Sequence, residues 1–324
     1  MPTPIVVPLD RSELAEEALP LASSIAARLQ RPLQLTLVHT GIPMLPEAGP
    51  NGMPDLDARL RQDEHAYLLE VARRLERERG VPVTTAILEG PVAPTLIAHA
   101  QSTEADLVVM STHGRGGLSR LFLGNVADRL IRELHCALAL VHAGNASPAP
   151  HAGEQRRVLI PLDGSALAES IIDRVLAVFG PDHLVLDLVQ VVPPSHDLFT
   201  SGSAALTVPT HLEQHLLFAN RYLHAVATRL RQLGLTVYVQ TRVASSVAQA
   251  ILSCADERQP QFIAVATRGL GGLERMLLGS VADKLVRGAR VPLLVWNPPP
   301  SASSETLFSA VGALANPSLG VAAR

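Results

Sequence analysis

Acidic residues that directly follow an apolar run occur at matching places in the two halves of this sequence. Asp10 ends the run Ile5-Val-Val-Pro-Leu-Asp10, and Asp163 ends Val158-Leu-Ile-Pro-Leu-Asp163. A carboxylate so placed can accept hydrogen bonds from a hydroxyl group or an amine of a bound molecule. Each aspartate can equally serve as a turn or helix N-cap residue, and the sequence alone leaves both interpretations open.

A glycine-rich segment also occurs twice, further along each half. Gly114-Arg-Gly-Gly-Leu-Ser-Arg-Leu-Phe-Leu-Gly124-Asn-Val-Ala-Asp128 returns as Gly269-Leu-Gly-Gly-Leu-Glu-Arg-Met-Leu-Leu-Gly279-Ser-Val-Ala-Asp283. Such glycines expose backbone N–H groups, and a helix that follows them adds its positive N-terminal end, which together suit a phosphate. Ordinary turn formation is the alternative for one copy. Because carboxylate and glycine segment recur together, the pattern favours two nucleotide sites, although duplication can also copy a turn that the fold requires.

These landmarks recur about 155 residues apart, which indicates duplication of a whole domain rather than a solenoid of short repeats. The length of 324 residues also fits two domains. A stretch rich in Pro, Gly, Ala and Ser separates the copies at residues 144–153. We therefore predict one domain at residues 1–144, a linker at 145–155, a second domain at 156–297 and a C-terminal tail at 298–324.

Short apolar runs alternate with amphipathic patterns in each half. Strands are expected at 4–9, 33–38, 81–88, 106–110 and 137–141, and near 157–162, 184–192, 235–243, 261–266 and 291–296. In the first half, helices are expected from about Ser12, Asp55, Val92 and Asn125. The alternation predicts an α/β protein of two tandem doubly wound domains, each with a five-stranded parallel sheet flanked by helices. Ligands bind such domains beyond the carboxyl ends of the strands, where the repeated aspartates and glycines lie.

The composition excludes several classes of protein. Hydrophobic residues make up 47% and charged residues 18%, with mean hydropathy +0.23, which is the reverse of a disordered chain. The net charge of −3 and the aromatic content of 3% argue against a nucleic-acid partner. Lys284 is the only lysine and follows Asp283, so the sequence contains no Walker A motif.

The cysteines and the N-terminal segment bear on the compartment. Cys136 and Cys254 match no zinc or redox spacing, so both are expected to be buried thiols in a reducing compartment. The first ten residues lack the features of a signal peptide, and residues 305–324 are too broken by Gly, Asn and Pro for a membrane span. A cytoplasmic protein with no membrane partner is expected.

Three apparent motifs carry little weight. The segments from Gly114 and Gly269 lack the last glycine of GxGxxG and follow a late strand, which argues against NAD or FAD. His211 and His215 lie one helical turn apart, but no third metal ligand is evident, so no metal site is expected. No nucleophile with an assigned base is present, so no catalytic residue is assigned.

Taken together, these residues resemble the universal stress protein family in its tandem form, over nearly all of residues 3–296. The family hallmark is GxxG, nine residues, then Gly and Ser or Thr. Here the first half reads Ser111-Thr-His-Gly114, nine residues, Gly124-Asn125, and the second reads Ala266-Thr-Arg-Gly269, nine residues, Gly279-Ser280. The resemblance implies an adenine nucleotide alpha hydrolase-like fold.

The resemblance also implies a ligand and its contacts. In family members that bind ATP, the early Asp meets adenine or ribose, backbone at the end of the second strand frames adenine, and the glycine loop with the following Ser holds ribose and phosphates. The first implied site comprises Asp10, Thr40, Ser111, His113, Gly114, Gly124 and Asn125. The second comprises Asp163, Val191, Ala266, Arg268, Gly269, Gly279 and Ser280. Because Asn125 replaces the expected Ser or Thr, the second site is the stronger candidate.

The function expected from this resemblance is binding of ATP, or of ADP or AMP, with Mg²⁺ as an optional companion. The nucleotide then acts as a conformational signal in a stress response, with weak ATPase activity at most. The alternatives are a stress adaptor with degenerate sites, which Ser111, Ala266 and Asn125 favour, and a nucleotidyl or phosphoryl transferase. The resemblance further implies that the two domains pair through their last strands, 137–141 and 291–296, and that the chain forms a homodimer.

Overall fold

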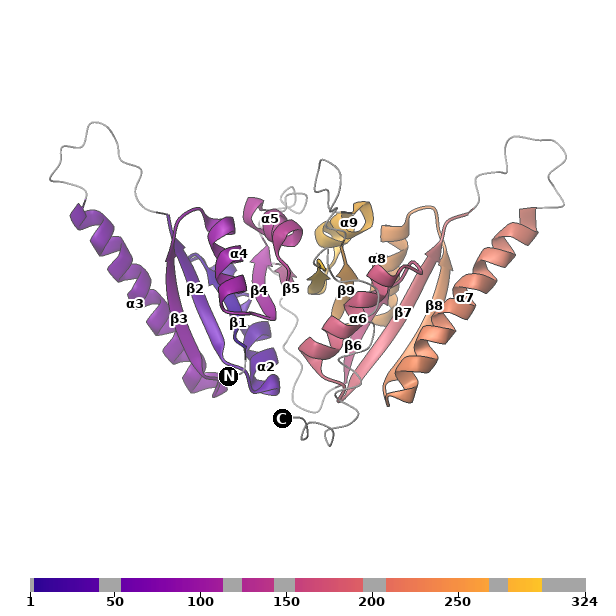
Figure 1. Ribbon diagram of the computed structural model, residues 1–324, viewed down its shortest axis with the longest axis horizontal. Helices are drawn as coiled ribbons and strands as arrows, with labels where there is room; N and C mark the ends of the chain where they lie inside the picture. Colours follow the sequence, from indigo (N-terminus) through magenta and orange to yellow (C-terminus); the bar gives the residue numbers. More distant parts are fainter. Residues whose placement is uncertain are drawn as a thin grey trace, which may run out of the picture. The chain divides into compact units, whose positions relative to one another are not determined.

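The computed structural model describes residues 3–40, 54–112, 124–142, 155–194, 208–267 and 279–298 (Figure 1). The chain divides into two compact units, Met1–Ala152 and Gly153–Arg324, called unit one and unit two below. Each unit is an α/β domain built around its own run of parallel strands.

Unit one has its strands in the order β3-β2-β1-β4-β5. The strands are β1 (Ile5–Leu9), β2 (Leu33–His39), β3 (Val83–Glu89), β4 (Leu107–Thr112) and β5 (Ala137–His142). The helices are α1 (Glu13–Glu16), α2 (Leu19–Leu29), α3 (Pro54–Arg79), α4 (Val92–Ser102) and α5 (Asn125–Glu133). Right-handed crossovers place α2 and α3 on one face and α4 and α5 on the other, in agreement with the contacts of α2 with α3 and of α4 with α5.

Unit two repeats this order as β10-β9-β6-β7-β8. Its strands are β6 (Arg156–Pro161), β7 (Leu184–Val192), β8 (Thr236–Val243), β9 (Phe262–Ala266) and β10 (Leu293–Trp296). Its helices are α6 (Ala166–Phe179), α7 (Val208–Gln232), α8 (Val247–Arg258) and α9 (Ser280–Gly288). In both units the strand order reverses beside the first strand, where doubly wound domains bind ligands.

The predicted fold class is confirmed, and most strand bounds agree within one or two residues. The strands are buried runs because helices cover both faces of each sheet; Ile5, Val7 and Leu35 are fully buried, for example. The phenyl rings of Phe179 and Phe262 pack in the core of unit two with their centroids 4.5 Å apart. In the described part of the chain, no helix has the length and apolar character needed to cross a membrane.

The single helix expected from Ser12 is wrong in one respect, because the structure divides it into α1 and α2. Pro20 lies in the first turn of α2, where the absence of its N–H and the fixed φ angle are tolerated, but it cannot continue the preceding turn. In unit two the equivalent helix α6 has no proline and is continuous. Cys254 is buried as predicted, whereas Cys136 is only half-buried, because it lies just before β5.

The loop after the first strand has a left-handed residue in both units, Arg11 with φ +66° and Gly164 with φ +87°. A side chain at this φ costs about 1–2 kcal/mol relative to glycine. We therefore expect Gly164→Ala to lower the free energy of unfolding by about 1 kcal/mol, and Arg11→Ala to be close to neutral because Arg11 already carries the strain. Urea unfolding of the two ligand-free variants measures this. Equal effects of the two substitutions would contradict it.

Candidate functional site

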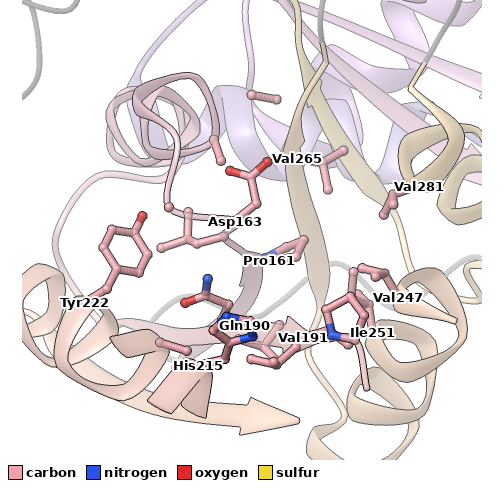
Figure 2. Close-up of a pocket in the computed structure, with 18 of the residues that line it drawn as sticks. Pro161, Asp163, Gln190, Val191, His215, Tyr222, Val247, Ile251, Val265 and Val281 are labelled. Carbon is pink, nitrogen blue, oxygen red and sulfur yellow. The ribbon is translucent and has the colours of Figure 1, made fainter. Parts of the chain in front are cut away.

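Each unit has a cavity at the carboxyl ends of its first two strands. The cavity of unit two, cavity two, has a volume of about 800 Å³, and that of unit one, cavity one, about 320 Å³. Ligand sites in proteins span roughly 300–1,000 Å³, so cavity two has ample room for a nucleotide while cavity one is at the lower limit. Cavity two is lined mainly by apolar side chains, including Val191, Val247, Ile251, Val265 and Val281 (Figure 2).

The two predicted aspartates line these cavities, and each is held by a turn. Asp163 Oδ1 accepts a hydrogen bond from the backbone N–H of Ser165 at 2.9 Å, and Ser165 Oγ in turn caps α6 by accepting from Ala168 N–H at 3.1 Å. Asp10 makes the same turn with Ser12, whose N–H lies 3.0 Å from Asp10 Oδ1. The aspartates are therefore turn residues and the serines are the N-caps.

This turn leaves the second carboxylate oxygen of each aspartate available. Within the described residues, Oδ2 of Asp163 and Oδ2 of Asp10 have no hydrogen-bond partner, and both side chains are exposed at the cavity. The turn thus fixes the direction of the carboxylate while leaving one oxygen for a ligand. The structural and binding interpretations of these residues are compatible.

Glycines precede the last helix of each unit, where the sequence places a phosphate. Gly279 is the N-cap of α9 with φ −54°, and Gly124 is the N-cap of α5 with φ −60°, so neither backbone conformation requires glycine. A Cβ added to Gly279 would meet no described atom within 4 Å. Neither helix has a side-chain cap, so the N–H groups of its first turn are available. The glycine keeps open a space that an anion can approach.

The structure brings several predicted residues together around each cavity. Asp163, Val191 and Ala266 line cavity two, where Gly279 and Ser280 directly precede the lining residue Val281. Asp10, Thr40 and Ser111 line cavity one, where Gly124 and Asn125 directly precede the lining residue Val126. His113, Gly114, Arg268 and Gly269 lie outside the described residues.

The strand register shows that Thr40 and Val191, both assigned to frame a base, are not equivalent positions. Pro8 pairs with Thr36, and Pro161 pairs with Val189. Counting on from these pairs, Val191 corresponds to Val38, and Thr40 corresponds to Pro193. Val38 also lines cavity one, and Pro193 also lines cavity two. Each cavity therefore has two positions at the end of its second strand that could contact a base.

Polar residues that the sequence analysis missed line the α7 end of cavity two. Figure 2 shows Gln190, His215 and Tyr222 there, with Asp163 above them. The Oε1 atom of Gln190 is buried and has no hydrogen-bond partner in the part of the chain that the structure describes. Burial raises the pKa of the Tyr222 hydroxyl, and the nearby charge of Glu169 raises this pKa further. No sequence motif marks these residues; only the correspondence of the two repeats reveals them.

A glutamate, a tyrosine and an arginine recur together beside both cavities. In unit one, Tyr67 donates a hydrogen bond to Glu16 Oε1 at 2.9 Å, and Arg74 pairs with the other oxygen of Glu16. In unit two, Arg229 pairs with Glu169 at 3.0 Å, but the hydroxyl of Tyr222 has no hydrogen-bond partner among the described residues. These groups join α3 to α1 in unit one and α7 to α6 in unit two. They recur at nearly the same offset as the other landmarks of the two repeats, so an alignment of the repeats could have identified them.

A buried ionic cluster borders cavity one and was also missed. His39, only 4% exposed, has Nε2 at 2.9 Å from Asp57 Oδ1 and Nδ1 at 2.8 Å from Glu64 Oε2. Because both ring nitrogens face carboxylates, the imidazole is a cation that donates to both. The hydrogen bond to Asp57 is the main cause that raises the pKa of His39, with Glu64 adding to it.

The partners of this cluster are set by α3. The pKa of Asp57 is lowered, first by its hydrogen bond to His39 and then by Arg61, which lies 2.9 Å away. Glu64 lines cavity one, so the cluster contributes a carboxylate to that cavity. No group of three or more His, Cys, Asp or Glu residues that could hold a metal ion occurs in the described ranges.

Comparison with known proteins gives consistent matches over both units. The model of the universal stress protein family matches residues 1–142 and again residues 154–297. Universal stress protein Rv2005c of Mycobacterium tuberculosis is 28% identical over 309 residues, which cover 90% of this chain and 96% of that protein. Universal stress protein Rv2623 of the same organism is 29% identical over 304 residues, with coverage of 90% and 95%.

Solved structures share the fold over nearly the whole chain. A universal stress protein from Archaeoglobus fulgidus superimposes with a TM-score of 0.63 at 17% identity, covering 91% of this chain and 98% of that one. The functionally unknown protein PA1789 from Pseudomonas aeruginosa gives a TM-score of 0.64 at 18% identity, with 97% of each chain covered. At these identities the structures support the fold alone.

Proposed function

This chain is a tandem member of the universal stress protein family, and on that premise we propose that unit two binds an adenine nucleotide, ATP in the first place, as a conformational signal in a stress response. The observation that carries the proposal is the combination of groups around cavity two. An available Asp163 oxygen, an apolar wall and the open, uncapped start of α9 lie on one rim.

The arrangement favours one orientation of the ligand. The phosphates belong at Gly279 and Ser280, where first-turn N–H groups and the positive end of α9 stabilise negative charge. The base then extends toward β7 and α7, along the side chains of Val191 and Phe218. Asp163 lies between these two ends and can accept a hydrogen bond from ribose or from the base.

A signalling role fits the side chains better than turnover does. Lys284, the only lysine, is exposed on α9, and no residue is assigned as a base that activates water. Any Mg²⁺ would come with the phosphates of ATP, since this ion is usually bound through substrate phosphates and one or two carboxylates. ATPase activity is therefore expected to be weak at most. A homodimer and a cytoplasmic location remain predictions of the family resemblance.

Unit one is the better candidate for a degenerate site. Its cavity of about 320 Å³ is the smaller, and Asn125 starts the helix where Ser280 does in unit two. We therefore expect unit two to bind the nucleotide more tightly than unit one.

Calorimetric titration of ATP into the whole chain tests the proposal. We expect one strong site, and a loss of affinity of roughly tenfold or more in Asp163→Ala, because a charged hydrogen-bond acceptor is removed. Asp163→Asn keeps an oxygen for the Ser165 turn, so it separates loss of charge from loss of the turn. Asp10→Ala is the matched control in unit one. Binding that is unchanged in Asp163→Ala would contradict the assignment.

A further inference from the structure

Two residues that line cavity two, Tyr222 and Gln190, have a buried polar atom with no hydrogen-bond partner among the described residues. Gln190 lines the cavity, and its Oε1 atom is enclosed without a hydrogen-bond partner in the described residues. Its partner across the sheet is Thr241 of β8, but the Thr241 hydroxyl donates to Asn220 Oδ1 at 3.3 Å instead. Because buried polar groups are nearly always hydrogen-bonded in native proteins, this amide requires an explanation.

Unit one shows that the fold does not need this amide. The strand register that aligns Thr36 with Val189 places Leu37 at the position of Gln190. Leu37 is 4% exposed and packs as an ordinary core residue. A leucine is therefore compatible with this strand, and an unpaired glutamine there lowers the stability of the free protein. A ligand that satisfies the amide accounts for its presence.

The strand order indicates which part of a nucleotide the amide meets. Strand β6 separates β9, which leads to α9, from β7, which carries Gln190. With the phosphates at the start of α9, the base lies at the β7 end. Figure 2 shows the amide of Gln190 directed into the cavity between Tyr222 and Asp163. A side-chain amide offers one acceptor beside one donor, which matches the neighbouring amine and ring nitrogen of adenine.

Building on the proposed function, we propose that Gln190 recognises the 6-amino edge of the adenine base in unit two. When the base binds, the Gln190 amide turns so that Oε1 faces the cavity and accepts a hydrogen bond from the exocyclic amine, while Nε2 donates to the adjacent ring nitrogen. Unit one, with Leu37 at this position, has no side chain for this contact. Gln190 is thus a specificity-determining residue that distinguishes the two units.

The test compares two ligands on two proteins. Purine riboside triphosphate lacks only the 6-amino group of ATP, so calorimetry of both ligands on wild-type protein and Gln190→Leu isolates the contact. We expect wild-type protein to bind ATP about tenfold more tightly than the analogue. Gln190→Leu should lose this preference for ATP, because no amide remains to accept from the 6-amino group, and should bind ATP more weakly than wild-type protein does. Leu37→Gln, the matched control in unit one, should leave the strong site unchanged.

Two results would overturn this proposal while leaving the proposed function intact. One is a Gln190→Leu variant that binds ATP as wild-type protein does; the other is an equal loss for both ligands, which would place the amide against another part of the nucleotide. Wild-type protein that binds neither ligand would overturn the proposed function as well. The thermal midpoint of ligand-free Gln190→Leu, expected at or above that of wild-type protein, checks that the variant folds.

Discussion

Substitution of His39 by valine should lower the free energy of unfolding of unit one by about 3 kcal/mol, because it leaves two partly buried carboxylates without the cation that pairs with them. Both ring nitrogens of His39 are hydrogen-bonded to carboxylates, and the side chain is 4% exposed. Glu64, with 14% of its side chain exposed, has the least access to water of the two acidic partners. Asp57 keeps Arg61, so most of the loss should come from Glu64.

Unit two supplies the control for this substitution. The long helices align at Tyr67 with Tyr222 and at Arg74 with Arg229, so Asp57 corresponds to Leu212 and Glu64 to Ala219. His39 corresponds to Val192 when the register that aligns Thr36 with Val189 is continued along β2 and β7.

A triple variant, His39→Val with Asp57→Leu and Glu64→Ala, therefore gives unit one the apolar residues of unit two. Replacing a buried ionic cluster with apolar residues is often neutral or stabilising, so this variant should recover most of the lost stability. Hydrogen exchange of the amides of β2 and α3 reads the effect in unit one alone. A triple variant as unstable as His39→Val would contradict the account.

The same cluster predicts a pH dependence of stability. The pKa of His39 is raised above 6.5 in the folded protein, so its contribution is complete below about pH 6.5 and is lost as the pH rises through the raised value. The lowered pKa of Asp57 has the opposite effect, with stability lost as the pH falls below 3.8. Unit one should therefore be more stable at pH 6 than at pH 9, and the triple variant should lose this difference. Parallel pH profiles in the two proteins would show that the cluster does not act this way.

Gly279→Leu should weaken nucleotide binding by about 100-fold or more, since the side chain would occupy the space kept open at the start of α9. Its φ of −54° suits any residue, and a Cβ meets no described atom within 4 Å. The cost in stability should stay at about 1 kcal/mol or less, the difference between glycine and an apolar residue at an N-cap. The change therefore separates binding from folding.

Gly124→Leu is the matched control for Gly279→Leu, because Gly124 is the N-cap of α5 with the same backbone conformation. It should leave the strong site of unit two intact. Calorimetry of ATP measures both variants. Wild-type affinity in Gly279→Leu would show that the nucleotide does not approach this helix.

The elements were predictable because local sequence determines them. Each strand is a short apolar run, and the matching landmarks identify two copies of one domain. The break at Pro20 was overlooked, although a proline there limits how far the preceding turn extends. Asp10 and Asp163 were predicted as site residues. That they form the turn while Ser12 and Ser165 serve as N-caps depends on turn geometry, which residue types alone do not specify.

The missed residues depend on alignment between distant segments. The importance of Gln190 lies in the contrast with Leu37, which only the strand register makes visible. In the sequence, His39 is only the last residue of an apolar strand. Its role depends on the two carboxylates that α3 places beside it in the fold. At these aligned positions one repeat has an apolar residue and the other a polar one. This mismatch was the signal in the sequence that could have identified the missed residues, and it marks where the two units differ.

The most direct test of nucleotide binding is to denature freshly purified protein and identify the released small molecules by chromatography and mass spectrometry. We expect an adenine nucleotide, released from wild-type protein and from Asp10→Ala but lost from Asp163→Ala. No released nucleotide, together with neither heat nor a shift in thermal midpoint on addition of ATP up to about 1 mM, would contradict it. The adaptor function with degenerate sites would then be the better explanation of this chain.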